Sequence, residues 1–438
     1  MISAEPVIHV GILERQPSVE GVLRDECTLG EKRFHGPFRV EKSGSGIRFT
    51  GGGETVEGSD LLLRPAGEQG IEIHNVKIGI QFHWERSETQ VFRGAIRFVE
   101  DGPGLTVINE VGLEEYLSSV ISSEMSATSP MELLKAHAIT SRSWLVAILN
   151  RSSAGTGAPP VPLTPEVEGE VIRWYDREEH AMFDVCADDH CQRYQGITKI
   201  SSGSARAAVE ATRGVFLVYE DAVCDARYSK SCGGISEGYE HVWDHRPVPY
   251  LQSISDAETD FGRVRTEGQA ERWITSRPAA YCNTTDAEIL RQVLPSFDQE
   301  TTDFFRWTVT YSQKELRELL RRKSGLEFGD VLDLQPLDRG RSGRIVRLKI
   351  VGSGRTVVVG KELEIRRWLS PTHLYSSAFV AGKEGTGKTP ERFVLRGAGW
   401  GHGVGLCQIG AAVMATQKKT AEQILLHYFR GAELRKLY

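Results

Sequence analysis

The sequence predicts an α+β protein with an antiparallel β-rich core, a helical segment and an inserted mixed α/β lobe. Residues 5–110 contain short apolar or alternating runs separated by Gly, Asp and Ser clusters, a pattern typical of strands. Between Gly112 and Asn150 the apolar spacing changes to that of helices. Residues 255–390 then mix a helical pattern with strand patterns, and we find no internal repeat.

In chain order, the first strands are predicted at Val7–Ile12, Ile47–Thr50, Leu61–Leu63, Ile71–Ile78, Arg93–Phe98 and Leu105–Val107. Apolar residues at helical spacing then predict a helix around Leu117–Ile121 and a longer one around Leu134–Ile148. The run Ser129-Pro130-Met131-Glu132 marks the start of the longer helix, with Ser129 as its N-cap. Glu124 therefore lies at a helix–helix junction.

The rest of the chain is predicted as an exposed loop at 151–170, helices at 204–213, 313–323, Gln408–Gln417 and Ala421–Arg430, and strands at Val215–Tyr219, Ala226–Ser231, 345–351 and 355–359. Four regions follow from these elements. They are an N-terminal β-rich region at 1–100, the first part of a catalytic core at 101–254, an inserted lobe at 255–390 and the C-terminal part of the core at 391–438.

Composition excludes some classes of partner. Among 438 residues, 53 Lys and Arg stand against 59 Asp and Glu, which gives a formal charge of -6. Such a chain has no basic field for binding nucleic acid by counterion release. No apolar run approaches the roughly 18 residues of a membrane span, and the N-terminus lacks the basic head and apolar stretch of a signal peptide. We therefore expect no membrane span and no signal peptide in this sequence.

Residues 382–389 have the spacing of a phosphate-binding loop, Gly-Lys-Glu-Gly-Thr-Gly-Lys-Thr. Such a loop cradles phosphate only where a helix begins at its Lys-Thr end. Here Pro390 follows, and Arg392–Leu395 has the pattern of a strand. We reject nucleotide binding and predict a Gly-rich hairpin loop between Ala378–Val380 and that strand.

His180, Cys186, His190 and Cys191 place four soft ligands within twelve residues. Thiolate and imidazole together favour zinc, which is tetrahedral in structural sites. The alternatives are a disulfide or two unrelated thiols beside surface histidines. Which histidine binds is left open, and water can fill the fourth position. A disulfide also stays open among Cys224, Cys232, Cys282 and Cys407.

Glu124 stands among apolar residues at the helix junction. Desolvation favours the protonated form of a carboxyl, as a general acid requires, although a Glu at a helix end is more often solvated or capping. Lys135 and Arg142 are seven residues apart on the second helix and therefore share one face. They can bind polar substrate oxygens or orient a carboxylate; an ordinary solvated charged stripe is the alternative.

Residues Gly399–Gly405 alternate glycine with other residues. This pattern allows a ligand or a second backbone to approach closely, and close packing alone would also explain it. Trp400 and His402 project from this run, and the indole suits stacking on a sugar ring. Ser229 and Ser231 place hydroxyls before a Gly-Gly turn and can line a polar groove, although any hydrophilic edge strand has this pattern.

Together these stretches resemble the stage II sporulation protein D family, which includes the amidase enhancer proteins. The matching stretches are Asn109–Leu117, Ser123-Glu124-Met125, Lys135-Ala136 with Arg142, the His180–Cys191 segment, Ser231–Gly234, Val242-Trp243, Pro249–Leu251 and Gly399–Gly405. They lie within residues 90–260 and 345–438. Cys407 departs from the pattern, because the family usually has a hydroxyl at this position.

The resemblance implies a lytic transglycosylase that cleaves the MurNAc–GlcNAc bond of peptide-free peptidoglycan glycan strands and leaves 1,6-anhydro-MurNAc ends. Glu124 matches the catalytic glutamate, which acts as acid and then as base. Lys135 and Arg142 match basic positions that bind substrate or orient Glu124. The family also implies a structural zinc ion at the Cys/His segment. The expected substrate-binding set is Lys135, Arg142, Ser229, Ser231, Trp400 and His402.

Two other functions compete with this one. A noncatalytic protein would bind glycan and enhance a separate cell-wall amidase. A zinc hydrolase would activate water at an open position of the Cys/His site. By the logic of its substrate the protein would work in the cell envelope, although the sequence shows no signal peptide.

Overall fold

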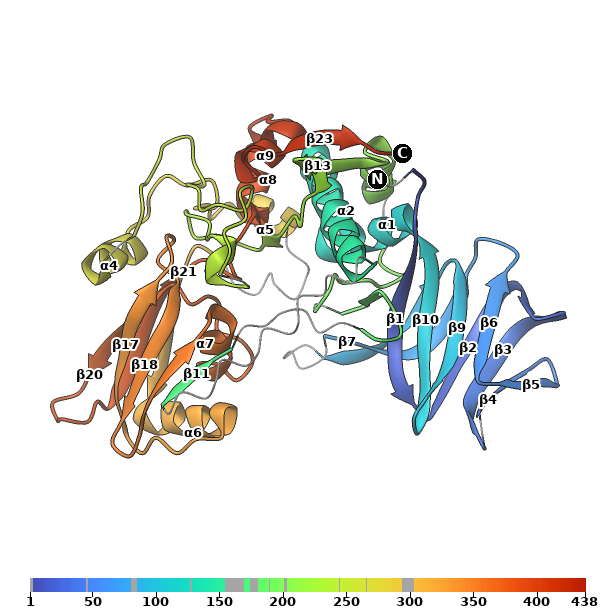
Figure 1. The fold of residues 1–438 in the computed structure, drawn as a ribbon, viewed down its shortest axis with the longest axis horizontal. Helices are drawn as coiled ribbons and strands as arrows, with labels where there is room; N and C mark the ends of the chain where they lie inside the picture. Colours follow the sequence, from blue (N-terminus) through green and yellow to red (C-terminus); the bar gives the residue numbers. More distant parts are fainter. Residues whose placement is uncertain are drawn as a thin grey trace. The chain divides into compact units, whose positions relative to one another are not determined.

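A computed structural model describes residues 3–44, 46–79, 85–126, 128–153, 169–173, 180–188, 190–200, 203–243, 245–264, 266–293 and 303–438. The chain packs as two compact units (Figure 1). Unit 1 comprises Met1–Ala138, Glu179–Val215 and Lys436–Tyr438, and unit 2 comprises Ile139–Glu178 and Phe216–Arg435. Mostly antiparallel sheets are combined with helices, so the predicted α+β class is confirmed. The four predicted regions stay a prediction.

Unit 1 is built on one large sheet with the strand order β12-β1-β10-β9-β6-β2-β3-β4-β5, and β7 joins β2 to β8. Its strands are β1 (Val7–Gln16), β2 (Ser18–Leu29), β3 (Lys32–Ser43), β4 (Gly46–Gly51), β5 (Glu54–Gly58), β6 (Asp60–Pro65), β7 (Ile71–Ile78), β8 (Arg86–Phe92), β9 (Ala95–Asp101), β10 (Gly104–Gly112) and β12 (Val185–Cys186). Within this list only β12 pairs parallel, with β1.

The unit 1 strands bury alternate side chains, as strands with one solvated face must. In β7, Ile71 and Ile73 are buried while Glu72 and His74 are partly exposed. The prediction of β7 was therefore right to the residue. The predictions missed β2, β3, β5 and β8, because charged residues occupy their exposed positions and Gly36-Pro37 interrupts the pattern of β3.

Among the described residues, three helices accompany the sheet. They are α1 (Leu113–Glu124), α3 (Gly203–Ala211) and α2 (Met131–Ser153), which runs from unit 1 into unit 2. In Figure 1, α1 lies beside β1 and β10. Buried residues surround nearly the whole of α1, so this helix is part of the core of unit 1.

The described part of unit 2 contains four smaller sheets, with the orders β11-β19-β18-β17, β16-β21-β20, β14-β13-β23 and β15-β22. Its strands are β11 (Glu170–Ile172), β13 (Val215–Tyr219), β14 (Ala222–Val223), β15 (Tyr228–Ser229), β16 (Arg306–Ser312), β17 (Val331–Arg339), β18 (Ile345–Gly352), β19 (Thr356–Gly360), β20 (Phe379–Glu384), β21 (Arg392–Ala398), β22 (Leu406–Cys407) and β23 (Glu433–Lys436). Its further helices are α4 (Glu267–Thr275), α5 (Ala287–Val293), α6 (Gln313–Ser324), α7 (Glu362–Trp368), α8 (Gln408–Thr416) and α9 (Ala421–Tyr428), with a 3₁₀ turn at Tyr239–His241.

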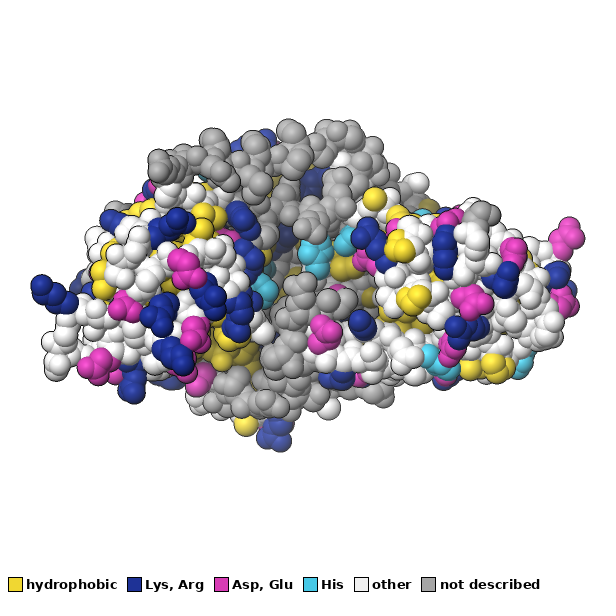
Figure 2. Space-filling model, turned by 90° about the horizontal axis from the view of Figure 1, so that it is seen from below, with side chains coloured by type: hydrophobic (Ala, Val, Ile, Leu, Met, Phe, Trp, Pro, Cys, Tyr) yellow, Lys and Arg dark blue, Asp and Glu magenta, His cyan; other side chains and the backbone are white. Residues whose placement is uncertain are grey.

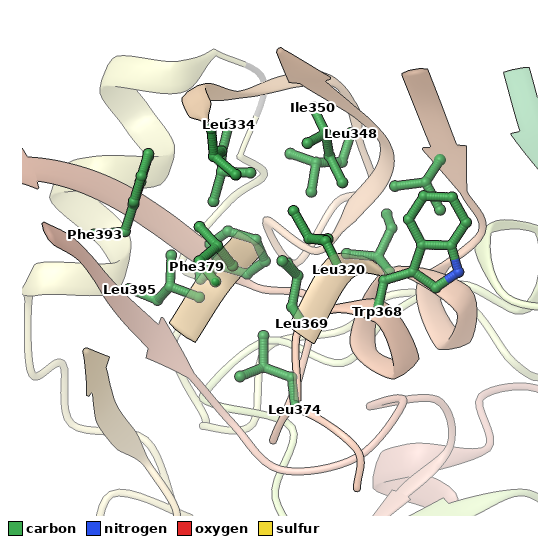
Figure 3. Close-up of a cluster of buried hydrophobic side chains, with 14 of the residues drawn as sticks. Leu320, Leu334, Leu348, Ile350, Trp368, Leu369, Leu374, Phe379, Phe393 and Leu395 are labelled. Atoms are coloured by element: carbon green, nitrogen blue, oxygen red, sulfur yellow. The ribbon is translucent and has the colours of Figure 1, made fainter. Parts of the chain in front are cut away.

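The apolar core of unit 2 lies between α6, α7 and the strands β16–β21. Figure 3 shows Leu320 of α6 and Trp368 of α7 among side chains from β18, β20 and β21. The Ser312 hydroxyl accepts a hydrogen bond from the Glu315 amide, and the Glu315 carboxylate accepts one from the Ser312 amide. This capping box starts α6 and is worth about 1 kcal/mol.

Residues 382–389, which have the spacing of a phosphate-binding loop, begin in β20 and lead to β21. Strands β20 and β21 pair antiparallel from Phe379↔Gly397 to Glu384↔Arg392, and no helix follows the loop. The predicted hairpin is confirmed. The predicted strand Ala226–Ser231 is shorter than expected, because only Tyr228–Ser229 pairs in register with β22.

The predicted loop 151–170 lies largely outside the described residues. Among the helices that the structure describes, none combines the length and apolar character needed to cross a membrane. On the face shown in Figure 2, described Lys and Arg side chains are interspersed with Asp and Glu. This mixture agrees with the small net charge of the sequence.

Candidate functional site

Glu124 is the last residue of α1, and its side chain is partly buried. The helix ends there because Met125 adopts an extended conformation, with its amide donating to the carbonyl of Ile121. Glu114 and Glu115 in the first turn suit the positive end of the helix dipole. A buried helix therefore fixes the backbone of Glu124, as expected for a residue at a helix junction.

The four predicted zinc ligands come together in unit 1. His180, Cys186, His190 and Cys191 each offer a ligand atom, and these atoms lie within 4.8 Å of one another. The His180 Nε2 atom lies 3.4 Å from the Cys191 Sγ atom, and the Cys186 Sγ atom lies 3.9 Å from the His190 Nδ1 atom. The Cys191 thiol and then burial raise the pKa of Cys186 to about 11. Two sulfur and two nitrogen donors at these separations fit a tetrahedral zinc ion.

The residues that follow Cys191 pack against α1. The Tyr194 hydroxyl donates to the Asn109 amide oxygen at 2.5 Å, and its ring stacks on Tyr116 with centroids 5.1 Å apart. The Gln195 amide donates to the Ser119 hydroxyl at 3.0 Å. The Cys/His segment is thereby attached to the helix that carries Glu124.

The two predicted basic residues of α2 have different environments. The Lys135 ammonium donates to the Glu132 carboxylate at 2.8 Å and is partly buried. Arg142 is completely buried, so it does not belong to a solvated charged stripe. A buried guanidinium is costly unless other groups satisfy it, which makes Arg142 the more constrained of the two positions.

In unit 2 the glycine-rich segment lies against β15, which carries Ser229, and against Ser231, which follows this strand. Ser231 and Trp400 form an antiparallel bridge, with the two amide-to-carbonyl distances at 3.0 and 2.8 Å. Ser229 pairs with Cys407 in the parallel pair β15–β22. Four of the predicted substrate-binding residues, Ser229, Ser231, Trp400 and His402, are therefore neighbours.

The glycines of this segment allow neighbouring groups to approach its backbone closely. All four from Gly399 to Gly405 at alternate positions have positive φ angles, which L side chains rarely adopt. A Cβ atom at Gly405 would lie 2.1 Å from the Arg227 carbonyl oxygen, and one at Gly399 would lie 2.8 Å from that of Ser231. The alternation thus marks a close approach of two backbones, which was one of the two interpretations of the sequence pattern.

Trp400 and His402 both contact other aromatic rings of unit 2. The Trp400 ring centroid lies 4.2 Å from that of Tyr375 and 4.6 Å from that of Phe304. His402 meets Trp243 edge to face at 4.7 Å, and its Nδ1 atom accepts from the Val404 amide. Burial, and then nearby arginines, lower the pKa of His402 well below its ordinary value. This shift favours the neutral form of the imidazole.

The hydroxyl groups of Ser229 and Ser231 are buried, and among the described residues they have no hydrogen-bond partner. The hydroxyl of Ser123, which precedes Glu124, is also buried and has no hydrogen-bond partner among the described residues. Leaving such a group unsatisfied costs about 1–3 kcal/mol. These are positions where a water molecule or a ligand group would add a missing hydrogen bond.

Sequence reasoning missed the polar groups that hold the glycine-rich segment. The buried Arg344 guanidinium donates to the carbonyls of Gly401 and Cys232, at 3.1 and 3.2 Å. The buried Glu237 carboxylate accepts from the Ser342 hydroxyl at 2.6 Å and contacts the His241 ring at 2.9 Å. The contacts of Arg344 and the contact of Glu237 with Ser342 join residues 57 to 112 positions apart, so no local pattern signals them.

Comparison with known families separates the chain into two matched parts. Residues 101–219 match the model of the stage II sporulation protein family, and residues 237–405 match a domain of unknown function, DUF8618. Residues 101–219 are thus similar to the stage II sporulation protein domain. This domain includes Glu124, Lys135, Arg142 and the Cys/His cluster, so the resemblance seen in the motifs is confirmed for this part of the chain.

Relatives that align with about three quarters or more of this chain include two named for sporulation or amidase enhancement. An uncharacterized protein of Brachyspira hyodysenteriae is 26% identical, with 83% of this chain and 79% of that protein aligned. Stage II sporulation protein D of Bacillus subtilis is 23% identical, with 75% of each chain aligned. The amidase enhancer of Bacillus subtilis is 24% identical over 73% of this chain and 40% of its own length.

Proposed function

We propose that this protein is a lytic transglycosylase that cleaves the MurNAc–GlcNAc bond of peptide-free peptidoglycan glycan strands. The observation that carries the proposal is the position of Glu124 within the matched sporulation domain, at the end of a buried helix. The names of the relatives, for sporulation and for amidase enhancement, support a cell-wall role.

In the proposed reaction Glu124 performs both proton transfers. Its carboxylic acid gives a proton to the GlcNAc oxygen as the bond from that oxygen to C1 of MurNAc breaks. The resulting carboxylate takes the proton of the MurNAc 6-hydroxyl while the oxygen bonds to C1 and closes the 1,6-anhydro ring. No water is consumed, so a second carboxylate to activate water, as in inverting glycosidases, is unnecessary.

We assign His180, Cys186, His190 and Cys191 to a structural zinc ion. Zinc would cross-link the segment whose next residues, Tyr194 and Gln195, contact α1. In this assignment the cluster acts as a positioning device for Glu124. The segment itself orients the helix through hydrogen bonds and ring stacking, and the ion takes no part in bond breaking.

Lys135 and Arg142 on α2 are assigned to binding substrate or orienting Glu124, and the complete burial of Arg142 favours the second role for that residue. Ser229, Ser231, Trp400 and His402 in unit 2 are assigned to substrate binding. The unsatisfied hydroxyls of Ser229 and Ser231 support a polar contact in that region. The His402 ring already accepts from the Val404 amide at Nδ1 and is hydrogen-bonded to the Tyr228 backbone, so its contribution to sugar binding would be packing beside Trp243. Since Trp400 already contacts Tyr375 and Phe304, any sugar stacking would add to an existing aromatic group.

The second candidate is a noncatalytic glycan-binding protein that enhances a cell-wall amidase. The amidase enhancer relative, aligned over 73% of this chain, favours it. In that case Glu124 would have no role in bond breaking, and glycan binding would survive its substitution.

The deciding experiment incubates peptide-free glycan strands with wild-type protein and with Glu124→Gln, followed by mass spectrometry. We expect anhydro-muramoyl ends with the wild type and at least about a 10³-fold lower rate with the variant, because one residue supplies both proton transfers. Glu68→Gln is the matched control, since its side chain is 88% exposed in unit 1. Absence of anhydro product with the wild type, while glycan binding persists, would favour the enhancer.

A further inference from the structure

A second cluster of soft ligands lies in unit 2, outside the proposed catalytic machinery. Cys232, Asp256, Cys282 and Cys407 each offer one donor atom, and these atoms lie within 4.8 Å of one another. All four residues are at most 2% exposed. They come from four separate segments: the turn after β15, the loop before α4, the loop before α5, and β22.

The separation between sulfurs fits metal ligation better than a disulfide. The Sγ atoms of Cys232 and Cys282 are 3.8 Å apart, and none of the three cysteines is disulfide-bonded. Two sulfurs bound at about 2.3 Å to one tetrahedral zinc lie about 3.8 Å apart, whereas a disulfide requires about 2.05 Å. The thiols are thus spaced as neighbouring corners of a zinc tetrahedron.

In the described part of unit 2, no cationic side chain forms an ion pair with the Asp256 carboxylate. Its carboxylate accepts from the Tyr428 hydroxyl at 2.6 Å and from the Cys282 amide at 2.8 Å, and within the described residues it forms no ion pair. Glu237, equally buried in the same unit, has the His241 ring at 2.9 Å. A buried carboxylate without a cation is costly, and a metal ion would remove that cost.

Two buried arginines that donate to backbone carbonyls at or beside Cys232 supply the positive charge that such a site needs. The buried Arg306 donates to the Gly233 carbonyl at 3.0 Å, and the buried Arg344 donates to the Cys232 carbonyl at 3.2 Å. Within the described part of the chain, neither guanidinium is in an ion pair. Three thiolates and one carboxylate around Zn²⁺ carry a charge of about -2, which these two guanidinium groups balance.

We propose that Cys232, Asp256, Cys282 and Cys407 bind one structural zinc ion. Three thiolates select a soft divalent metal, and a fourth protein ligand closes the coordination shell against water. The Tyr428 hydroxyl orients the carboxylate from outside that shell. The ion fixes the Ser231–Trp400 bridge, because Cys232 directly follows Ser231 and its amide lies 3.3 Å from the Cys407 sulfur.

The test measures metal in the full-length protein, purified under reducing conditions, by mass spectrometry of the elements. We expect about two zinc ions per chain in the wild type and one fewer in Cys282→Ser. Cys224→Ser is the matched control, because Cys224 is a fully buried thiol of unit 2 outside the cluster, and its zinc content should equal that of the wild type.

A second variant tests the proposal even if Cys282→Ser does not fold. The double variant Cys186→Ser/Cys191→Ser removes the sulfur ligands of the other cluster, and we expect it to retain about one zinc ion. Cobalt substituted into that variant should show thiolate-to-metal charge transfer. A variant free of zinc, or a Cys232–Cys282 disulfide found by peptide mapping of unreduced protein, would overturn the proposal. Neither outcome bears on Glu124, so the proposed reaction is tested separately.

Discussion

The two thiol clusters differ in how the chain assembles them. The cluster of unit 1 comes from twelve consecutive residues, and its His190 side chain is exposed. The cluster of unit 2 joins residues up to 175 positions apart, and all its members are buried. A short segment can close around a metal on its own, whereas distant segments meet only when the unit folds. The first cluster should therefore affect mainly its neighbours, and the second should affect the whole of unit 2.

The largest expected effect comes from removing a ligand of the buried cluster. Cys407→Ser should lower the free energy of unfolding of unit 2 by at least about 3 kcal/mol, because it removes a metal ligand and leaves a buried carboxylate unpaired. Cys186→Ser should cost less than half as much, since its surroundings are partly exposed. Thermal unfolding followed by circular dichroism measures both. Equal losses for the two variants would contradict the proposed difference between the clusters.

Sequence reasoning found what is local and missed what is not. The strand β7, the hairpin β20–β21 and the cluster around Cys186 depend on neighbouring residues, so periodicity and spacing predicted them. The contact of Cys232 with Cys282 depends on the packing of a whole unit, and the sequence left it open as a disulfide. Strands such as β3 were missed because their exposed faces are highly charged and resemble loops.

A smaller loss of stability is expected when Glu237 is substituted. The charge of this buried carboxylate is offset by the His241 ring and not by a metal. Burial opposes ionisation, but hydrogen bonds from His241, Ser342 and the Gly238 amide lower the pKa of Glu237 overall. The pKa of His241 is raised, because its contact with Glu237 outweighs burial. Glu237 thus stabilises the fold above its unfolded pKa and loses this contribution as pH falls. His241 stabilises below its unfolded pKa and loses its contribution as pH rises.

The two contributions overlap between about pH 4.5 and 6.5, where the pair should be most stabilising. Glu237→Gln should lower the free energy of unfolding by about 2 kcal/mol at pH 6, and by less at pH 8 and at pH 4. Urea unfolding at the three values tests this. A loss independent of pH would mean that the hydrogen bonds to Ser342 and Gly238, and not the charge pair, account for the stability.

The smallest effect concerns the local influence of the first cluster. Tyr194→Phe removes the hydroxyl that donates to Asn109 and should cost about 1 kcal/mol, because it leaves a buried acceptor unsatisfied. Tyr311→Phe is the matched control in unit 2, since the Tyr311 hydroxyl donates to the Leu369 carbonyl at 2.7 Å. Both variants should lose similar stability in urea and keep their zinc.

Only Tyr194→Phe should slow the release of anhydro-muramoyl ends, because only Tyr194 contacts the strand and helix that precede Glu124. If both variants cleave glycan at the wild-type rate, the Cys/His segment does not orient the catalytic helix through this contact, and the first cluster serves stability alone.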